Sequence, residues 1–487
     1  MTPVAAAFPR LSDLADVRFA NRFVAELPAG PCYTIVQPTP VAAPKLLAWS
    51  SDLAAELALA SPSSRSLQML AGNLITPGMQ PYSARYGGHQ FGHWAGQLGD
   101  GRAITLGEIA GQEIQLKGAG LTPYSRTADG RAVLRSSLRE FLCSEAMNWL
   151  GVPTTRALSL VATGEPVIRD MFYDGHPAPE PGAIVCRVAP SFVRFGNFQI
   201  LEDEHRKQLA DFVIRHQYPG LSHADFFQEV CRRTALLMVD WMRLGFVHGV
   251  MNTDNLSILG LTIDYGPYGW LEGYDPQWTP NTTDLPGRRY CYGNQPQIAL
   301  WNLTRLAESL LGFVAKDSLE SGLELYTTIY QDAMSNALAE KLGVESLDEE
   351  LMNGLFGLLG ASETDFTLFF RNLAKVEKPS DVEALRPAFY AQPDLPSWEG
   401  WLKAYLARAK PGRAERMNAV NPKYIFRNYL AVLAIEALEK GDAAPLERLM
   451  RVLARPYDEQ PGEEDLATRR PDWARERAGC SALSCSS

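Results

Sequence analysis

The chain has 487 residues, 46% of them hydrophobic, and a formal net charge of −10 at pH 7. A chain of this length and composition can form roughly three domain-sized units with ordinary hydrophobic cores. The negative charge argues against broad electrostatic binding of nucleic acid or anionic membrane, and no segment approaches the about 18 consecutive apolar residues of a membrane span.

The cysteines indicate a reducing compartment. There are seven, scattered along the chain and without a Cys-x-x-Cys motif, which is unlike a secreted disulfide framework. The apolar run Val4–Phe8 is too short for a secretory signal, so we expect a cytoplasmic protein. Cys480 and Cys485 lie in a small polar tail, where an exposed thiol would be reactive; incidental thiols at a frayed terminus are the alternative.

Residues 1–80 are expected to form an N-terminal extension with one amphipathic helix at about 44–60. Residues 81–200 are predicted to form a strand-rich unit, because short apolar segments alternate there with turn residues. Its expected elements are strands 103–109 and 113–117, a helix at about 132–150 that ends at Gly151, and a strand pair near 157–162 and 183–188.

Helical periodicity dominates from about residue 202 onward. The expected elements are a helical unit, 201–310, whose main helix 226–244 ends at Gly245, a long loop at 265–297, a helical C-terminal region, 311–455, with a break near 379–396, and a tail, 456–487. A strand-rich unit followed by a helical one predicts an α+β fold of the two-lobed protein-kinase-like type. The nucleotide would lie between the lobes, and the helical C-terminal region would be an addition to that fold.

A glycine-rich turn precedes the first of the expected strands. Gly99 and Gly101 would let backbone N–H groups approach phosphate oxygens, and Arg102 adds a cation; a simple hairpin turn is the alternative. Lys117 ends the second strand, and no other lysine occurs from residue 46 to 206. An ammonium group there suits contact with a phosphate, although an ordinary strand-end lysine fits the pattern as well.

A carboxylate on the following helix would orient Lys117, as in the lysine–glutamate pair of kinases. Glu140 and Glu145 are the two candidates. The spacing favours Glu140, while Glu145 lies on the apolar side of the helix and needs a partner of its own if it is buried.

The run from His248 to Gly266 carries the strongest signal in the chain. Kinases place an aspartate two residues after a histidine, then an asparagine, then a strand that ends in Asp-Phe-Gly. Here Asn255 and Asp264 are the corresponding ligand types for Mg²⁺ or Mn²⁺, whereas Val250 occupies the position of the usual base. The run therefore predicts a metal–nucleotide site without that base; a turn aspartate and a capping asparagine are the alternative.

Three further residues could complete such a site. Asp254 is the remaining carboxylate of the run, and a base at this position could accept a proton from a hydroxyl that attacks a different phosphorus atom. Arg187 and Arg194 add guanidinium groups, which bind phosphate bidentately. They exceed the cations that a kinase usually brings to ATP and could hold the phosphates in an unusual orientation; surface arginines are the alternative.

Several longer segments together resemble the selenoprotein O family of pseudokinases. The resemblance covers essentially the whole chain, and its blocks are long and specific. They are Tyr86-Gly-Gly-His-Gln-Phe-Gly, Gln97-Leu-Gly-Asp-Gly-Arg-Ala, Gln115-Leu-Lys-Gly-Ala-Gly, Asp129-Gly-Arg-Ala-Val-Leu-Arg, Gly249-Val-Met-Asn-Thr-Asp-Asn and Ile263-Asp-Tyr-Gly-Pro-Tyr-Gly.

The resemblance implies a metal-dependent protein adenylyltransferase. Such enzymes bind ATP inverted relative to kinases, transfer AMP to Ser, Thr or Tyr hydroxyls of proteins and release pyrophosphate. The residues implied to contact the nucleotide are Gly99, Gly101, Arg102, Lys117, Asp129, Gly130, Arg187, Arg194 and Asp264, to which we add Glu140 as the partner of Lys117. Asp254 is implied as the proton acceptor, and Asn255 and Asp264 as the ligands of Mg²⁺ or Mn²⁺.

The chain departs from this family in its cysteines. Cys485 stands where animal members have selenocysteine, and Thr279 stands where some bacterial relatives carry a loop cysteine. A disulfide between tail and loop would need another partner, and Cys291 is the candidate.

AMP transfer to proteins is thus the leading hypothesis. A kinase-type phosphotransferase with Asp254 as the base and transfer of UMP from UTP are the alternative activities. A nucleotide-binding scaffold without catalysis is a further hypothesis.

Overall fold

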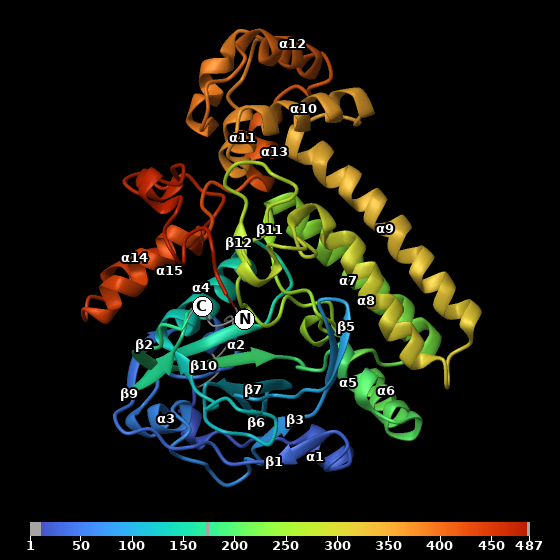
Figure 1. Ribbon diagram of the computed structural model, residues 1–487, viewed down its shortest axis with the longest axis vertical. Helices are drawn as coiled ribbons and strands as arrows, with labels where there is room; N and C mark the ends of the chain where they lie inside the picture. The colour runs from blue at the N-terminus through green and yellow to red at the C-terminus, as the bar shows by residue number, and fades with distance from the viewer. Residues whose placement is uncertain (1–10, 172–174, 485–487) are drawn as a thin grey trace, which may run out of the picture.

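The computed structural model describes residues 11–171 and 175–484. An antiparallel sheet dominates the N-terminal part, and helices make up most of the C-terminal half (Figure 1). The α+β class expected from the sequence is therefore confirmed.

The large sheet has eight strands, all in antiparallel pairs. The strand order is β1-β3-β6-β7-β10-β9-β2, with β8 paired to β10. The strands are β1 (Tyr33–Ile35), β2 (Lys45–Trp49), β3 (Tyr82–Ala84), β6 (Ala103–Ile109), β7 (Gln112–Lys117), β8 (Ala132–Val133), β9 (Arg156–Arg169) and β10 (Ala178–Ala189). Two small separate pairs are β4 (Gly87–Gln90) with β5 (His93–Gln97) and β11 (Phe246–Val247) with β12 (Gly269–Trp270).

The four strands expected within the strand-rich unit are confirmed, and two are longer than expected. β6 has the expected bounds, and β7 begins one residue earlier. β9 and β10 extend into a long hairpin beyond the buried segments that the sequence indicated. Most side chains of the extended parts lie at least partly exposed, so no continuous apolar pattern marked them.

The single helix expected at about 44–60 is wrong. The segment forms strand β2, which pairs with β9 at one edge of the sheet, and then a short helix, α2 (Ser51–Glu56). Ser50 separates the two because its side chain accepts the backbone N–H of Leu53 and so caps the helix. Pairing with a distant strand overrode the local helical periodicity. Strands β1 and β2 therefore bring part of the expected N-terminal extension into the sheet.

The remaining helices cover the sheet and build the C-terminal half. They are α1 (Arg22–Glu26), α3 (Ser64–Leu70), α4 (Leu134–Trp149), α5 (Phe195–Ile200), α6 (Asp203–Gln217), α7 (His223–Leu244), α8 (Gln295–Leu310), α9 (Lys316–Leu342), α10 (Glu349–Ala361), α11 (Phe366–Leu373), α12 (Leu395–Leu406), α13 (Arg413–Val420), α14 (Asn428–Glu439) and α15 (Ala444–Leu453). The helix expected at about 132–150 is α4, and the one expected at 226–244 is α7.

Helix α4 connects the sheet to the helical half. Leu138, Phe141 and Leu142 are fully buried, and the helix packs against β9, β10 and α14. Gly151 follows its end in a left-handed conformation, as expected for a helix stop. The opposite face of the sheet has its own core, formed with α2 and α3.

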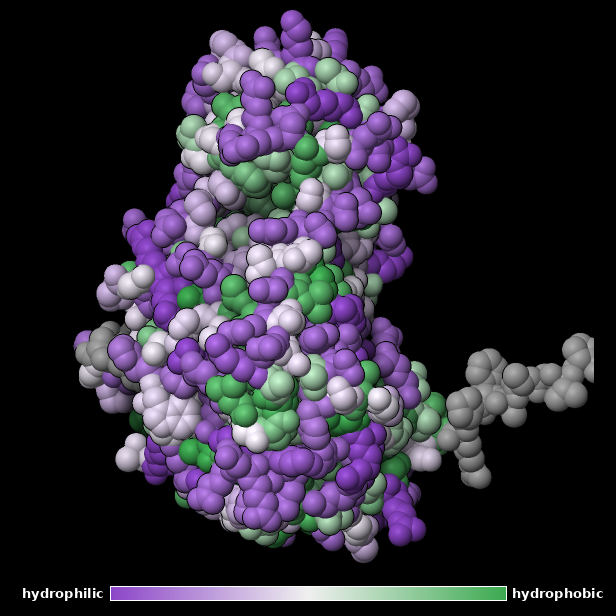
Figure 2. Space-filling view, turned by 90° about the vertical axis from the view of Figure 1, so that its right-hand side faces the viewer, coloured by the Kyte–Doolittle hydropathy of each residue, from purple (hydrophilic) through white to green (hydrophobic). Residues whose placement is uncertain are grey.

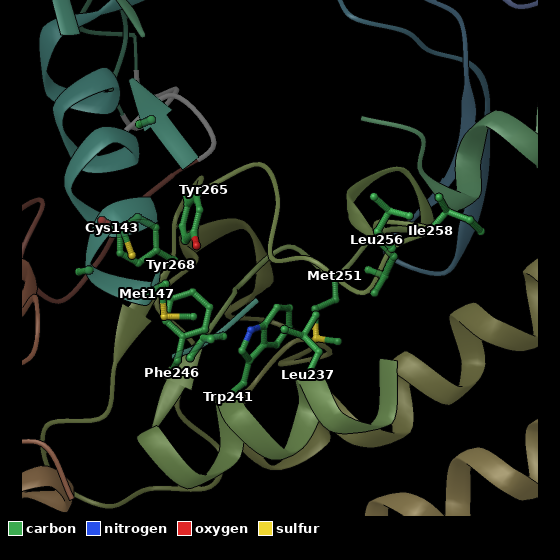
Figure 3. Close-up of a cluster of buried hydrophobic side chains, with 14 of the residues drawn as sticks. Cys143, Met147, Leu237, Trp241, Phe246, Met251, Leu256, Ile258, Tyr265 and Tyr268 are labelled. Atoms are coloured by element: carbon green, nitrogen blue, oxygen red, sulfur yellow. The ribbon is translucent and has the colours of Figure 1, made fainter. Parts of the chain in front are cut away.

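The segment after α7 rests on a buried apolar cluster. Gly245 ends α7 with φ of 75°, and β11 and the His248–Gly266 run follow. Figure 3 shows Cys143 from α4 beside Tyr268 and Trp241 from α7 near Phe246, in one cluster with Tyr265 of this run. The cluster fixes the run between the two helices.

The C-terminal helices form two groups. Helix α9 lies along α7, and α10 to α13 gather around a separate core at the far end of the molecule (Figure 1). Helices α14 and α15 return to pack on α4.

Within the described ranges, no helix combines the length and the hydrophobicity that crossing a bilayer requires. On the face seen in Figure 2, hydrophobic side chains form small separate groups among hydrophilic ones.

Candidate active site

The pairing of β7 with β10 brings two polar side chains together. Arg187 lies directly opposite Gln115, and Lys117 lies two residues further along the same face of β7. The side-chain oxygen of Gln115, Oε1, accepts N–H groups from Nε of Arg187, at 3.0 Å, and from Nη2. Nη1 of Arg187 binds the acidic partners and contacts Glu140 at 3.2 Å.

Helix α4 supplies the carboxylate that orients Lys117. Glu140 lies 2.6 Å from the Lys117 ammonium, whereas Glu145 binds Arg156 at 2.8 Å. Of the two acids expected, Glu140 is therefore the partner of Lys117. Burial lowers the pKa of Lys117, and Glu140 opposes this effect by stabilising the charged form.

Asp264 is the point where the cations meet. Its two oxygens bind Nη1 of Arg187 and Nη1 of Arg194, and Lys117 lies 3.9 Å away. Burial alone would raise the pKa of Asp264, but the three cations hold it well below its usual range. Its φ of 55° is a left-handed conformation, which is strained for an aspartate and typical of functional positions.

The run before Asp264 is held by its own hydrogen bonds. A ring nitrogen of His248 lies 2.8 Å from the Ile263 carbonyl oxygen, which ties the start of the run to its end. Asn255 closes a short 3-10 helix, η2 (Thr253–Asn255), and its amide nitrogen donates to the Val250 carbonyl at 3.0 Å. No described residue donates a hydrogen bond to the amide oxygen of Asn255, so this oxygen can ligate a cation.

A cleft of about 720 Å³ is lined by residues of the sheet and of the His248–Gly266 run. Ten of the residues expected to form the site line it: Gly99, Gly101, Arg102, Lys117, Asp129, Gly130, Glu140, Arg187, Asn255 and Asp264. Two do not. Arg194 is absent from the lining but binds Asp264, which does line the cleft, and Asp254 lies under a neighbouring hairpin.

The glycines before β6 have a packing role. A Cβ at Gly99 would collide with the Tyr124 ring, and one at Gly101 would lie 2.9 Å from the Tyr124 carbonyl oxygen. The segment around Tyr124 folds over the turn because both side chains are missing. The Arg102 carbonyl accepts the backbone N–H of Gly118 at 2.7 Å, and the Arg102 side chain lies at the cleft wall, where no described residue forms a hydrogen bond or ion pair with it.

Asp129 and Gly130 lie in the same segment, next to the β9–β10 hairpin. Asp129 binds the Arg169 guanidinium at 2.7 Å, which lowers the pKa of the carboxyl group. Gly130 accepts the backbone N–H of Gly120 at 3.0 Å, and its φ of 70° suits glycine. Asp129 and Gly130 line one side of the cleft together with Asp170, which follows β9.

Asp254 is covered by the β4–β5 hairpin. It is 7% exposed, and Gln90 donates to its Oδ2 at 3.2 Å. A Cβ at Gly88 would collide with its Oδ1, so the hairpin approaches as closely as a glycine allows. Burial raises the pKa of Asp254 to about 6, and the Gln90 hydrogen bond opposes the rise.

The sequence did not predict three residues that contact the site: Gln115, Gln90 and Asp100. Asp100 is buried in the cleft wall, where Gln115 donates to it at 3.3 Å and Arg194 lies 3.8 Å away. The period of two along β7 places Gln115 on the face of Lys117 and was the available signal. No sequence signal indicated Gln90, because its contact with Asp254 spans 164 residues of sequence.

The C-terminal tail docks beside the loop that follows Asp264. Leu483 N–H donates to the Pro280 carbonyl at 2.9 Å, and Thr282 N–H donates to the Leu483 carbonyl at 2.7 Å. The expectation of exposed tail thiols is wrong for Cys480, which is buried and whose pKa burial raises to about 11. Cys485 lies outside the described residues.

Comparison with known proteins identifies the family. Residues 15–454 match the family model described as "Protein adenylyltransferase SelO". The chain is 57% identical to a protein nucleotidyltransferase YdiU of Nitrosospira multiformis, with 98% of each chain covered. It is 55% identical to the protein of the same name from Aromatoleum aromaticum, with 96% of this chain and 99% of the relative covered.

The match extends over nearly the whole chain and includes every residue of the cleft described above. It agrees with the family expected from the motifs. The protein belongs to the SelO family of protein adenylyltransferases and is a protein nucleotidyltransferase.

Proposed function

We propose that this enzyme transfers AMP from ATP to Ser, Thr or Tyr hydroxyls of proteins and releases pyrophosphate, with ATP inverted relative to its orientation in kinases. Family membership supports nucleotide transfer to proteins. The main support for the inverted orientation of ATP is the cluster of cations around Asp264. We also infer that the sheet and the helical half correspond to the two lobes of a protein kinase, because the cleft between them holds the Lys117–Glu140 pair.

The cation cluster favours the terminal phosphate of ATP. Arg187 and Arg194 are 2% and 1% exposed, so an anion that reaches them is almost fully withdrawn from water. Two guanidinium groups and the Lys117 ammonium match the most highly charged end of a triphosphate. With this end inward, the α-phosphorus lies nearer the cleft mouth and faces an incoming hydroxyl.

Asn255 and Asp264 fit a divalent cation. The Asn255 oxygen is available, and Asp264 is held ionised by its cationic neighbours. Two hard oxygen ligands, completed by phosphates and water, are the usual protein contribution to a Mg²⁺ or Mn²⁺ site. Such an ion would neutralise charge on the phosphates and on the departing pyrophosphate.

Asp254 is the proposed proton acceptor. With a pKa of about 6 it is mostly ionised at neutral pH and still basic enough for general-base catalysis. The acceptor oxygen attacks the α-phosphorus, and its proton passes to Asp254. The bond between the α-phosphorus and the bridging oxygen breaks, and pyrophosphate leaves with that electron pair.

Isotope labelling tests this function. The enzyme is incubated with a protein extract and ATP labelled on either the α- or the γ-phosphorus, in the presence of Mg²⁺ or Mn²⁺. We expect protein-bound label only from the α position. Label only from the γ position would identify a kinase instead, and α-labelled UTP in a parallel reaction tests UMP transfer.

A further inference from the structure

The β4–β5 hairpin covers polar groups that have no partner. Oδ1 of Asp254 and both Nε and Nη2 of Arg289 are buried, and none has a hydrogen-bond partner among the described residues. Buried donors and acceptors are almost always paired, so each exception needs an explanation. One acceptor and two donors lie under the same element.

The hairpin is fixed only along its inner side. His89 N–H donates to the Thr253 hydroxyl at 2.7 Å, and Phe91 N–H donates to the Tyr290 hydroxyl at 2.9 Å. Among the described strands, β5 pairs with β4 alone, and Trp94 on β5 is 47% exposed. The hairpin thus has an outer strand that faces solvent.

Arg289 lies against the turn of this hairpin. A Cβ at Gly92 would be 3.2 Å from its Cζ, and its guanidinium lies 4.7 Å from the centre of the Trp301 ring. Asp284 accepts the backbone N–H of Arg289 at 3.0 Å, but within the described ranges no carboxylate forms an ion pair with the guanidinium. Asp284 interacts electrostatically with the guanidinium and partly balances its charge, while Nε and Nη2 keep no hydrogen-bond partner among the described residues.

The unpaired groups of Asp254 and Arg289 are connected through residues that contact both of them. Tyr290, which follows Arg289, donates its hydroxyl to Asn252 at 2.7 Å, two residues before Asp254. On the other side, Gln90 reaches Asp254 while Gly92, two residues later, touches Arg289. A short peptide segment could supply a hydroxyl to Asp254 and an anion to Arg289.

This inference rests on the proposed function and extends it to the acceptor. We propose that the acceptor protein docks at the β4–β5 hairpin with an acidic side chain on Arg289, which places the neighbouring hydroxyl at Asp254. The acidic side chain satisfies the guanidinium donors, and the hydroxyl satisfies Oδ1. The preferred acceptor is thus a Ser, Thr or Tyr with Asp or Glu nearby in the chain.

Defined polymers test the preference. The wild-type enzyme and α-labelled ATP are incubated with a random copolymer of glutamate and tyrosine or with one of lysine and tyrosine. We expect the acidic copolymer to be labelled at least tenfold better. In Arg289→Gln the KM for the acidic copolymer should rise at least tenfold, while the Kd for ATP and the thermal unfolding midpoint stay the same.

The neighbouring residue provides a matched control. Arg288 is exposed and carries the same charge in the same loop, so Arg288→Gln should have a much smaller effect. Arg289→Glu should reverse the preference and favour the basic copolymer, which a merely structural role would not do.

The outcomes separate the two proposals. Equal labelling of both copolymers, equal effects of the two neutral variants, or no label in the acidic copolymer while other proteins are labelled would each overturn the docking proposal alone. Label transferred only from γ-labelled ATP would overturn the proposed function, and the charge preference would then be read from that label.

Discussion

The two sides of the proposed reaction centre differ in how far their polar groups are satisfied. On the nucleotide side, Lys117, Arg187 and Asp264 each have charged partners within the chain, and Gln115 fixes the arginine. Nε of Arg194 is the exception, because no described residue bonds it, although its Nη1 binds Asp264. On the acceptor side, Asp254 keeps an unpaired oxygen under a hairpin. A site whose charges already compensate one another is preorganised for its ligand, whereas unpaired buried groups favour a state in which a partner supplies the missing contacts.

The largest effect is expected on the nucleotide side, from Asp264→Asn. The amide cannot balance two buried guanidinium groups or serve as a carboxylate ligand of the metal, so transfer of label from α-labelled ATP should fall by at least about 10³-fold. Initial rates over a range of Mg²⁺ and Mn²⁺ concentrations measure the loss. Circular dichroism checks that the variant is folded, and near-normal activity in the folded variant would contradict the assignment.

On the acceptor side, Asp254→Asn should remove general-base catalysis and lower the rate by about 10²–10⁴-fold. The wild-type rate should rise with pH as Asp254 loses its proton and level off above its pKa of about 6. The variant should lack this dependence on pH and still bind ATP. A wild-type rate that is independent of pH between 5 and 7 (about one unit either side of that pKa) would remove Asp254 from this role.

Two glutamates of α4 allow a matched comparison of function with stability. Glu140→Gln weakens the contact that orients Lys117 and should lower kcat/KM by about 10–100-fold, by analogy with other buried charge-assisted hydrogen bonds. Glu145→Gln breaks the pair with Arg156 and should lower the free energy of unfolding with little change in kcat. Urea titration measures the free energy of unfolding of both variants, and steady-state kinetics measures their kcat and KM. Equal kinetic defects would show that helix stability, and not the lysine contact, controls activity.

The smallest of these effects is expected from Gln115→Leu. Loss of its two contacts with Arg187 should raise the KM for ATP by about tenfold, the equivalent of one hydrogen bond to a charged group, with kcat nearly unchanged. Gln115→Glu keeps the acceptor oxygens but adds a negative charge near the phosphates. If it binds ATP as well as the wild type does, charge balance at this position is unimportant.

Residue types and spacing predicted that Lys117, Glu140 and Asp264 lie close together. Lys117, Glu140 and Asp264 lie in segments whose local patterns place them, and the structure brings them together. The same patterns failed where distant pairing decides the outcome. The segment at 44–60 became a strand because β9 offered it an edge, and the cover of Asp254 comes from a hairpin far away in sequence.

The position of Asp254 was the least predictable feature of the site. As the remaining carboxylate of the run it was the candidate base, but its burial and its pKa depend on Gly88 and Gln90, which no local signal connects to it. Contacts of this kind follow only from the packed structure.

The central claim is that the triphosphate enters the cleft with its terminal phosphate first. The most direct test is a crystal structure of the enzyme with a non-hydrolysable ATP analogue and Mg²⁺. The account predicts the γ-phosphate at Lys117, Arg187 and Arg194 and the α-phosphate toward Asp254. A γ-phosphate that points to the cleft mouth, with the adenosine near the cation cluster, would contradict it.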